Sequence, residues 1–320
     1  MDVSTIIDSF REDFYSLVQQ IPEGKVSTYG ALARALGDIR AARAVGKMLN
    51  ENPRPIIVPC HRVVMSDGKI GGFGMGVPKK IEMLAEEGVE VEDGEVVDFE
   101  DVLFEDFESD KPLNKLRGNQ EEIKKSIIIK DDFDELEIVG GVDVSYKDYY
   151  GYAALSIWEG KEEKAIVFEE GETPFPYISS YLSFRETPLI KKLLEKVEKT
   201  PDVLLVDGNG IMHPRGIGLA SQLGVMADIP TVGVAKSQLC GKLEDEVTHK
   251  DPVSRVLDEG NLLGYAYLSS DRAKNPIYVS PGHRVSHETA LEVVKMYCNY
   301  KIPDPIRSAH INATKRRKEA

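Results

Sequence analysis

Residues 138–145 read Ile-Val-Gly-Gly-Val-Asp-Val-Ser, an apolar and largely β-branched run that contains a single acid, Asp143. Such a run is typical of a buried β-strand. Two more strand-like runs follow at 153–158 and 165–169, and then a helical pattern at 188–199 precedes an apolar run at 202–207. Three successive strands followed by alternating elements predict an α/β fold with a central mixed sheet flanked by helices.

The first 90 residues have a different, mostly helical pattern. Apolar residues in 9–21 recur with the 3.6-residue period of a helix, and further helices are expected at 28–36 and 39–50. Two short helices joined by a turn that contains Gly37 predict a helix-turn-helix, with Arg43 and Lys47 on one face of the second helix. The same pattern also fits a small helical bundle with a solvated basic face.

The acidic residues are concentrated in one segment. The whole chain has a net charge of −14, and residues 89–110 hold 11 acids and no base. The charge of the whole chain therefore does not exclude a nucleic-acid partner for either half. We expect a solvated linker or an exposed strand pair at about 89–112, between one domain at 1–100 and another at 113–320.

Composition also indicates the cellular compartment. No run of 18 apolar residues occurs, so a membrane span is not expected. The three cysteines, at 60, 240 and 298, are too far apart for a disulfide framework. We expect a cytoplasmic protein without a membrane partner, and the sequence identifies no protein partner.

Residues 56–64, Ile-Ile-Val-Pro-Cys-His-Arg-Val-Val, place Cys60 beside His61 between two apolar runs. A neighbouring imidazole can take the thiol proton, directly or through water, and the thiolate is then the nucleophile. A buried cysteine also often serves as a small apolar residue. This dipeptide alone therefore leaves both interpretations open.

The residues around Cys60 strengthen the nucleophile interpretation. Residues 21–91 resemble the active-site domain of O6-alkylguanine-DNA alkyltransferases, through Val-Ser-Thr-Tyr-Gly at 26–30, Ala-Arg-Ala-Val-Gly at 42–46, Asn-Pro at 52–53, Pro-Cys-His-Arg-Val at 59–63 and Gly-Gly-Phe-Gly at 71–74. The resemblance implies a mostly α, winged helix-turn-helix domain that transfers alkyl groups from guanine O6 to Cys60. The transfer would be a single turnover without metal or cofactor.

The same resemblance implies roles for individual residues. His61 would be the water-mediated base and Glu87 would orient it. Arg43 would insert into the duplex, Tyr29 would help rotate the nucleotide out, and Asn52 would brace the active-site turn. An O6 substituent in a stacked duplex is out of reach of a thiolate, so the nucleotide must be extruded. The chain departs from the family pattern at 73–74, where Phe and Gly replace Tyr and Ser.

Acids also mark a second group of candidate residues. Asp143 lies inside one apolar strand and Asp207 ends another, positions that are costly for a carboxylate unless it is paired or binds a cation. Converging carboxylates suit Mg²⁺, and Glu186 is a possible third ligand. Lys236 follows a further strand and could position water. Each of these residues alone is more often a strand-end or salt-bridged residue.

Residues 113–310 resemble endonuclease V, which has an RNase H-like fold. The resemblance is carried by ordered segments that include 141–146, 176–178, 182–186, 206–210, 213–216, 218–221, 233–236 and 280–284. It implies Mg²⁺-dependent hydrolysis, with Mn²⁺ as an alternative, of the second phosphodiester 3′ to deoxyinosine. The chain departs from the family pattern at 179–180, where Ser-Ser replaces Pro-Gly. It departs again at position 222, where it has glutamine and the family often has histidine.

This second resemblance also implies residue roles. The metal ligands would be Asp143, Glu186 and Asp207, with His283 a weaker candidate. Lys236 would assist the attacking water. The DNA contacts would include Tyr177, as a wedge that separates the lesion from its partner base, and His213.

The two resemblances together predict a bifunctional DNA repair enzyme, an alkyltransferase joined to a deoxyribonuclease, with damaged DNA as its partner. Its lesions would be O6-alkylguanine and deoxyinosine. Two alternatives stay open. The N-terminal half could be a non-catalytic lesion-sensing or regulatory DNA-binding module, and the nuclease could act on inosine in RNA.

Overall fold

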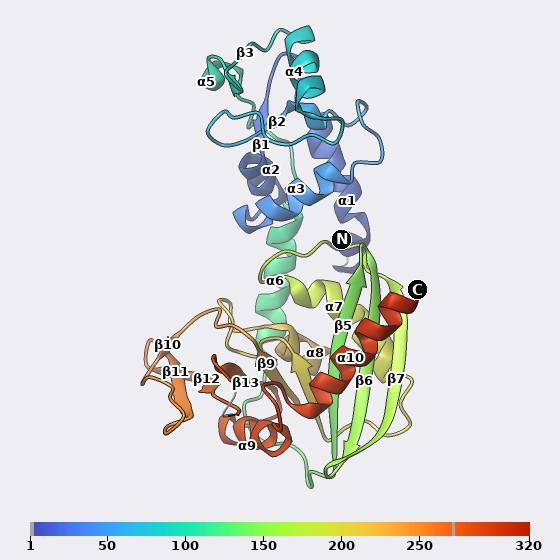
Figure 1. Cartoon of the computed structure of the whole chain (residues 1–320), viewed down its shortest axis with the longest axis vertical. Coiled ribbons are helices and arrows are strands. Elements are labelled where there is room, and N and C mark those ends of the chain that lie inside the picture. The colour runs from blue at the N-terminus through green and yellow to red at the C-terminus, as the bar shows by residue number, and fades with distance from the viewer. Residues whose placement is uncertain (1–2, 271–272) are drawn as a thin grey trace. The chain divides into compact units, whose positions relative to one another are not determined.

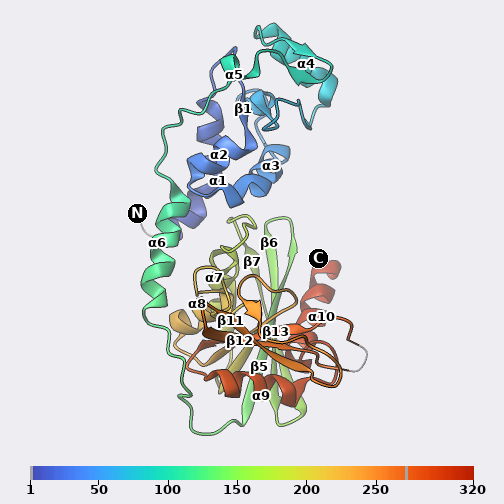
Figure 2. The ribbon, with the colours of Figure 1, turned by 90° about the vertical axis from the view of Figure 1, so that its left-hand side faces the viewer.

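The chain folds into two compact units in the computed structural model, which describes residues 3–270 and 273–320 (Figures 1 and 2). The N-terminal unit comprises Met1–Gly118 together with Pro174–Ser179. The C-terminal unit comprises Asn119–Thr173 and Ser180–Ala320. Each unit has its own buried core and is described separately below.

The N-terminal unit is mostly helical, as the sequence predicts. Helix α1 (Val3–Gln19) buries one stripe that includes Phe10, Phe14 and Val18. Helix α2 (Tyr29–Leu36) starts at Thr28, whose hydroxyl accepts a hydrogen bond from the Ala31 amide at 3.0 Å, so the first turn is capped. The turn between the helices contains the 3₁₀ segment η1 (Ile39–Ala41), and helix α3 (Ala42–Asn50) follows. The expected helix-turn-helix is therefore α2 and α3.

A short parallel strand pair connects this helical pair to the cysteine motif. Strand β1 (Ser27–Thr28) immediately precedes α2, and it pairs with β2 (Val63–Val64), which follows the 3₁₀ segment η2 (Cys60–Arg62). Helix α4 (Val77–Glu86) then returns over a small core that contains Val26, Val64 and Leu84. Cys60 is thus fixed between the start of α2 and the core under α4.

The acidic stretch is an integral part of the N-terminal unit. It forms the antiparallel pair β3 (Val91–Glu92) and β4 (Glu95–Val96) and the short helix α5 (Phe99–Val102), so an exposed strand pair is present. Its apolar residues face inward: Val89 and Val96 are buried in the core beside Val26. The backbone of Val26 bonds on both sides, to Val102 at 2.9 Å and to Phe104 at 2.7 Å.

A mixed nine-stranded sheet forms the centre of the C-terminal unit, in the order β10-β11-β12-β13-β9-β8-β5-β6-β7. β5, β8 and β9 are parallel to one another, and the remaining neighbouring pairs are antiparallel. The strands are β5 (Ile138–Lys147), β6 (Tyr150–Glu159), β7 (Glu162–Glu172), β8 (Val203–Asp207), β9 (Thr231–Ala235), β10 (Lys242–Leu243), β11 (Val253–Asp258), β12 (Asn261–Tyr267) and β13 (Ile277–His283).

Helices cover both faces of this sheet. Successive side chains of a strand point to opposite faces, so a buried strand contributes apolar residues to two cores. On β8, Val203 and Leu205 belong to the core under α9 (His287–Tyr297), whereas Leu204 and Val206 belong to the core under α7 (Leu182–Leu194) and α8 (Leu219–Ala227). Helix α6 (Pro112–Lys124) precedes β5 along the chain. The expected α/β fold is confirmed.

Helix α10 (Asp304–Glu319) packs directly on β5 and β6 (Figure 1). At Gly141 a Cβ atom would lie 2.1 Å from the carbonyl carbon of Pro305, closer than atoms can approach. Glycine at this position therefore allows the start of α10 to contact the strand backbone. Within residues 3–270 and 273–320, no helix combines the length and apolarity needed to cross a membrane.

Candidate active sites

Cys60 is the first residue of η2, and its thiol is held by an amide. The side chain of Asn52 donates from Nδ2 to the Cys60 sulfur at 3.3 Å and to the Val58 carbonyl at 3.0 Å. Its Oδ1 accepts a bond from the Arg54 amide at 2.9 Å. Asn52 therefore braces the turn that carries the cysteine.

His61 and Glu87 form the second part of this site. The Nε2 atom of His61 lies 2.8 Å from Glu87 Oε1, and the Arg62 guanidinium donates to both oxygens of Glu87 at 2.8 Å. Burial raises the pKa of Glu87, but the bonds from Arg62 and His61 outweigh it, so the net pKa is lowered. Burial lowers the pKa of His61 despite the opposing effect of Glu87, so the ring is neutral near pH 7.

The other ring nitrogen of His61 faces the interior. Nδ1 is buried and has no hydrogen-bond partner among the residues that the structure describes. With Nε2 engaged by Glu87, Nδ1 is the atom that can receive the thiol proton, directly or through water. The residues expected from the sequence thus come together as Asn52, Cys60, His61 and Glu87.

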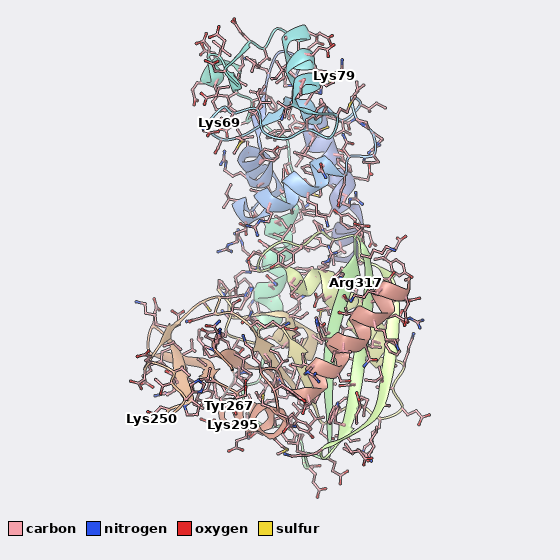
Figure 3. All side chains as sticks on the ribbon, viewed as in Figure 1. Lys69, Lys79, Lys250, Tyr267, Lys295 and Arg317 are labelled. Atoms are coloured by element: carbon pink, nitrogen blue, oxygen red, sulfur yellow. The ribbon has the colours of Figure 1, made fainter. Side chains whose placement is uncertain are left out.

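Lys80 is a member of this site that the sequence did not reveal. It is 0% exposed, and its ammonium donates to the carbonyls of Val63 and Ile70 at 2.6 Å and of Gly72 at 3.3 Å. Burial lowers the pKa of Lys80 to about 8, against the attraction of Cys60. Its neighbour Lys79 instead points outward from α4 (Figure 3) and pairs with Glu82 at 2.9 Å.

A cavity of about 280 Å³ opens beside the Cys60 thiol. A cavity of about 150 Å³ holds a benzene ring, so this space suits a base with two fused rings. Arg43 lies exposed on α3, the helix that also supplies residues to the wall. The lining residues are Tyr29, Gly46, Leu49, Asn50, Cys60, Gly72, Phe73 and Gly74.

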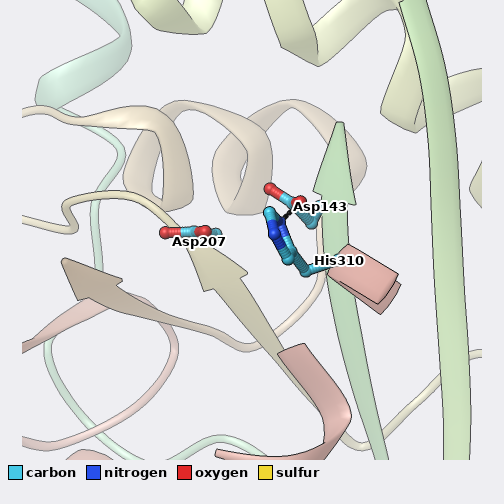
Figure 4. A group of neighbouring side chains, drawn as sticks. All are labelled: Asp143, Asp207 and His310. Carbon is cyan, nitrogen blue, oxygen red and sulfur yellow. Dashed lines mark hydrogen bonds and ion pairs between the residues drawn. The ribbon is translucent and has the colours of Figure 1, made fainter. Parts of the chain in front are cut away.

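In the C-terminal unit, two of the expected acids meet where parallel strands lie side by side. Asp143 lies on β5 and Asp207 ends the neighbouring β8. His310 of α10 joins them: its Nδ1 lies 2.7 Å from Asp143 Oδ2, and one ligand atom from each of the three residues lies within 4.8 Å of the others (Figure 4). Lys236 Nζ lies 2.5 Å from Asp207 Oδ2.

Glu186 adds a buried carboxyl group to this cluster. It lies on α7 and is 8% exposed. Burial, and then the charges of Asp143 and Asp207, raise the pKa of Glu186 well above its ordinary value. The pKa of Asp143 is raised as well, by burial and by Asp207. Carboxylates crowded in this way are stabilised by a divalent cation, and oxygen-rich ligand sets suit Mg²⁺ or Mn²⁺.

The structure does not bring His283 to this cluster. His283 is the last residue of β13, and its Nδ1 accepts a hydrogen bond from the Ile128 amide at 3.2 Å. Burial, and then Arg284, lower the pKa of His283. The histidine beside the acids is His310, which the sequence did not single out. The available signal was Gly140-Gly141, because paired glycines in a strand indicate a close backbone approach, here by the start of α10.

The two expected DNA contacts differ in accessibility. Tyr177 lies in the segment 174–179 and is 58% exposed. His213 is only 6% exposed, and its Nδ1 accepts a bond from the Arg215 amide at 3.3 Å. Tyr177 is thus available to a partner, whereas His213 is held inside its own turn.

Comparisons with known proteins match both parts of the chain to known families. A family model described as Endonuclease V matches residues 121–311, and one described as 6-O-methylguanine DNA methyltransferase, DNA binding domain, matches residues 9–89. A protein of Picrophilus torridus called bifunctional methyltransferase/endonuclease is 38% identical over 296 residues, which cover 92% of this chain and 93% of that protein. A protein of the same name from Thermoplasma volcanium is 35% identical, with 92% and 87% covered.

Solved structures match the C-terminal part. The catalytic domain of human endonuclease V superposes with a TM-score of 0.61 at 32% identity and covers 66% of this chain and 98% of that one. Endonuclease V of Ciona intestinalis, solved with a DNA 24-mer containing an inosine followed by a ribo-adenosine, gives a TM-score of 0.60 at 32% identity, with 66% and 99% covered.

Proposed function

This chain belongs to the bifunctional methyltransferase/endonuclease family, and we propose that it repairs DNA by two separate reactions. One is the single-turnover transfer of an alkyl group from guanine O6 to Cys60. The other is hydrolysis of the second phosphodiester 3′ to deoxyinosine, with Mg²⁺ or Mn²⁺. The observation that carries the proposal is the presence, in one chain, of the Asn52–Cys60–His61–Glu87 contacts and of the Asp143–Asp207–His310 group.

In the first reaction the thiol proton passes to His61, and the Cys60 sulfur attacks the alkyl carbon. The new S–C bond forms as the C–O6 bond breaks, and the guanine leaves with that electron pair and takes up a proton. Asn52 donates a hydrogen bond to the sulfur, and the Lys80 ammonium interacts with Cys60 electrostatically. The thioether product is stable, so one chain repairs one lesion.

In the second reaction Asp143, Glu186, Asp207 and His310 would hold the divalent cation. Bound there, the cation would polarise the scissile phosphate. Lys236, paired with Asp207, would orient the attacking water and offset negative charge that develops on the phosphate. His310 takes the place proposed for His283 on sequence grounds, because its ring lies beside Asp143.

Damaged DNA is the proposed partner of both units. The Ciona relative was solved with inosine-containing DNA, and both reactions need a nucleotide outside the stack. Tyr177 would assist extrusion of the nucleotide for the nuclease reaction, and Arg43 and Tyr29 would do so for alkyl transfer. Cys60, Cys240 and Cys298 are free cysteines, which supports the proposed cytoplasmic location.

Two assays on the same preparations test the proposal. After incubation with O6-methylguanine duplex, the intact mass of the wild type should rise by one CH₂, and Cys60→Ala should show no rise. With an inosine-containing duplex and Mg²⁺, the wild type should nick, whereas Asp207→Ala or added EDTA should abolish nicking. Each variant serves as the control for the other assay. A wild type without adduct would favour the non-catalytic sensor for the N-terminal unit.

Action on inosine in RNA is a second candidate for the nuclease. The observation in its favour is the ribo-adenosine after the inosine in the strand bound by the Ciona relative. Competition between deoxyinosine-containing DNA and inosine-containing RNA at equal concentration distinguishes the two. Preferential cleavage of the RNA would replace DNA as the nuclease substrate.

A further inference from the structure

The turn at Ser180 has a backbone conformation that suits glycine. Ser180 has a φ of +65°, in the left-handed region that residues with a Cβ rarely adopt. The endonuclease V pattern has glycine at this position. Ser180 therefore needs a neighbouring group to hold the turn. The position matters because Ser180 directly follows the segment 174–179, which carries Tyr177, and directly precedes Tyr181, the N-cap of α7.

Arg215 supplies that group. Its guanidinium donates from one terminal nitrogen to Ser180 Oγ at 3.2 Å and from the other to the Ser180 carbonyl. The serine is thus bound through its side chain and its backbone at once. The side chain whose Cβ atom makes the left-handed turn unusual also carries the hydroxyl that Arg215 binds.

The Arg215 side chain is itself fixed on its remaining sides. It is 9% exposed, its Nε donates to Gln120 Oε1 at 2.8 Å, and its guanidinium lies over the Tyr181 ring at 4.3 Å from the centroid. The Gln120 amide in turn donates to Ser183 Oγ and Gln222 Oε1, both at 3.2 Å. Every nitrogen of the guanidinium is used, so the fork geometry of arginine is needed here.

We propose that Arg215 is a positioning residue of the nuclease reaction, which fixes the left-handed turn at Ser180, the residue that directly follows segment 174–179 along the chain. The inference rests on the proposed function, in which Tyr177 separates an inosine from its partner base. Gln222 belongs to the same arrangement: where the family often has histidine, its amide oxygen receives the bonds of Gln120 and Ser183 that keep Gln120 in place for Arg215.

The test uses the full chain and two inosine substrates that differ only in pairing. One has the inosine in a paired duplex, and the other has it in an unpaired bubble, where no partner base must be displaced. Arg215→Lys keeps the charge but loses the fork and the planar stack. For this variant kcat/KM on the paired substrate should fall about tenfold, and on the bubble by less than about twofold.

Ser180→Gly is the second variant, because glycine adopts the left-handed turn without help. Alone it should change nicking of either substrate by less than about twofold. Combined with Arg215→Lys it should restore most of the paired-substrate activity, to within about threefold of the wild type. Arg255→Lys, at an exposed arginine paired with Glu244 in the same unit, is the matched control and should change neither. Thermal unfolding of each variant checks that the fold is intact.

The outcomes separate the two ideas. Equal losses on paired and bubble substrates, or no rescue by Ser180→Gly, would overturn the positioning role of Arg215 and leave the nuclease proposal standing. A wild type that nicks the paired duplex but not the bubble would overturn the wedge role of Tyr177, and the inference with it. A wild type that nicks neither with Mg²⁺ would overturn the proposed nuclease function itself.

Discussion

The two candidate sites address opposite electrostatic problems. Around Cys60 the chain places an amide donor, a neutral imidazole that can accept a proton, and the buried ammonium of Lys80. In the C-terminal unit it crowds three carboxyl groups so closely that the pKa values of Asp143 and Glu186 rise. The first site includes a buried positive charge, Lys80, whereas the second gathers negative charge of the kind that suits a divalent cation.

Glu186→Gln should have the largest effect, and it should affect the acid cluster without affecting the Cys60 site. Loss of a carboxylate ligand should lower Mg²⁺-dependent nicking by about 10³-fold, while alkyl transfer to Cys60 stays unchanged. The metal-free variant should also unfold a few degrees higher than the metal-free wild type, because a source of charge repulsion is gone. Nicking kinetics and calorimetry in EDTA measure both. A loss of activity together with a lower unfolding temperature would show that Glu186 stabilises the fold instead.

His310→Ala tests which histidine completes the metal site. The Mg²⁺ concentration for half-maximal nicking should rise about 10- to 100-fold, because His310 contacts Asp143 directly. His283→Ala is the matched control, and its Mg²⁺ requirement should stay within about threefold of the wild type. The measurement is a titration of the nicking rate against Mg²⁺ concentration. A larger increase in Mg²⁺ requirement for His283→Ala than for His310→Ala would indicate His283 as the ligand.

Lys80→Met sharpens the description of the thiol site. The variant removes a buried positive charge and leaves three carbonyls without their donor. Alkyl transfer should slow about tenfold, and the free energy of unfolding of the N-terminal unit should fall by about 2 kcal/mol. Lys79→Met, one residue away on the outer face of α4, should change neither. Similar losses in both variants would contradict a specific role for Lys80.

The pH dependence of alkyl transfer is the smallest expected effect near neutral pH. The pKa of His61 lies below 6.5, so the ring is already neutral at pH 7 and can accept a proton. The rate should change by less than about twofold between pH 7 and 8 on this account, and should fall at acidic pH as His61 is protonated. Glu87 raises the pKa of His61, so Glu87→Gln should move the acidic limb to lower pH. A shift to higher pH would contradict the assignment.

Much of the fold could be predicted from the sequence, because periodicity and strand-end acids are local signals. The helical pair at 28–50 and the neighbouring strands with Asp143 and Asp207 lie where the pattern indicates. The helix expected at 188–199 instead runs from Leu182 to Leu194 with Pro188 inside it. Burial of Phe184, Ile190 and Leu193 outweighs the hydrogen bond that the proline removes.

The residues that the sequence did not reveal depend on tertiary placement. A lysine is normally solvated, so nothing local distinguishes Lys80 from Lys79 except its spacing of four from the buried Leu84. His310 depends on which strand its helix crosses, and only the close approach at Gly141 fixes that. The buried links of Arg215 to Gln120 and Ser180 join residues 95 and 35 positions apart.

The position of His310 on α10 has a consequence for the order in which the chain matures during synthesis. The contacts around Cys60 involve residues no later than Glu87, so that site can close early. The acid cluster is incomplete until residue 310 has emerged, more than 200 residues later. At about 5–20 residues per second this interval is roughly 10–40 s. We expect nascent chains stalled near residue 290 to accept a methyl group while they are still unable to cut DNA.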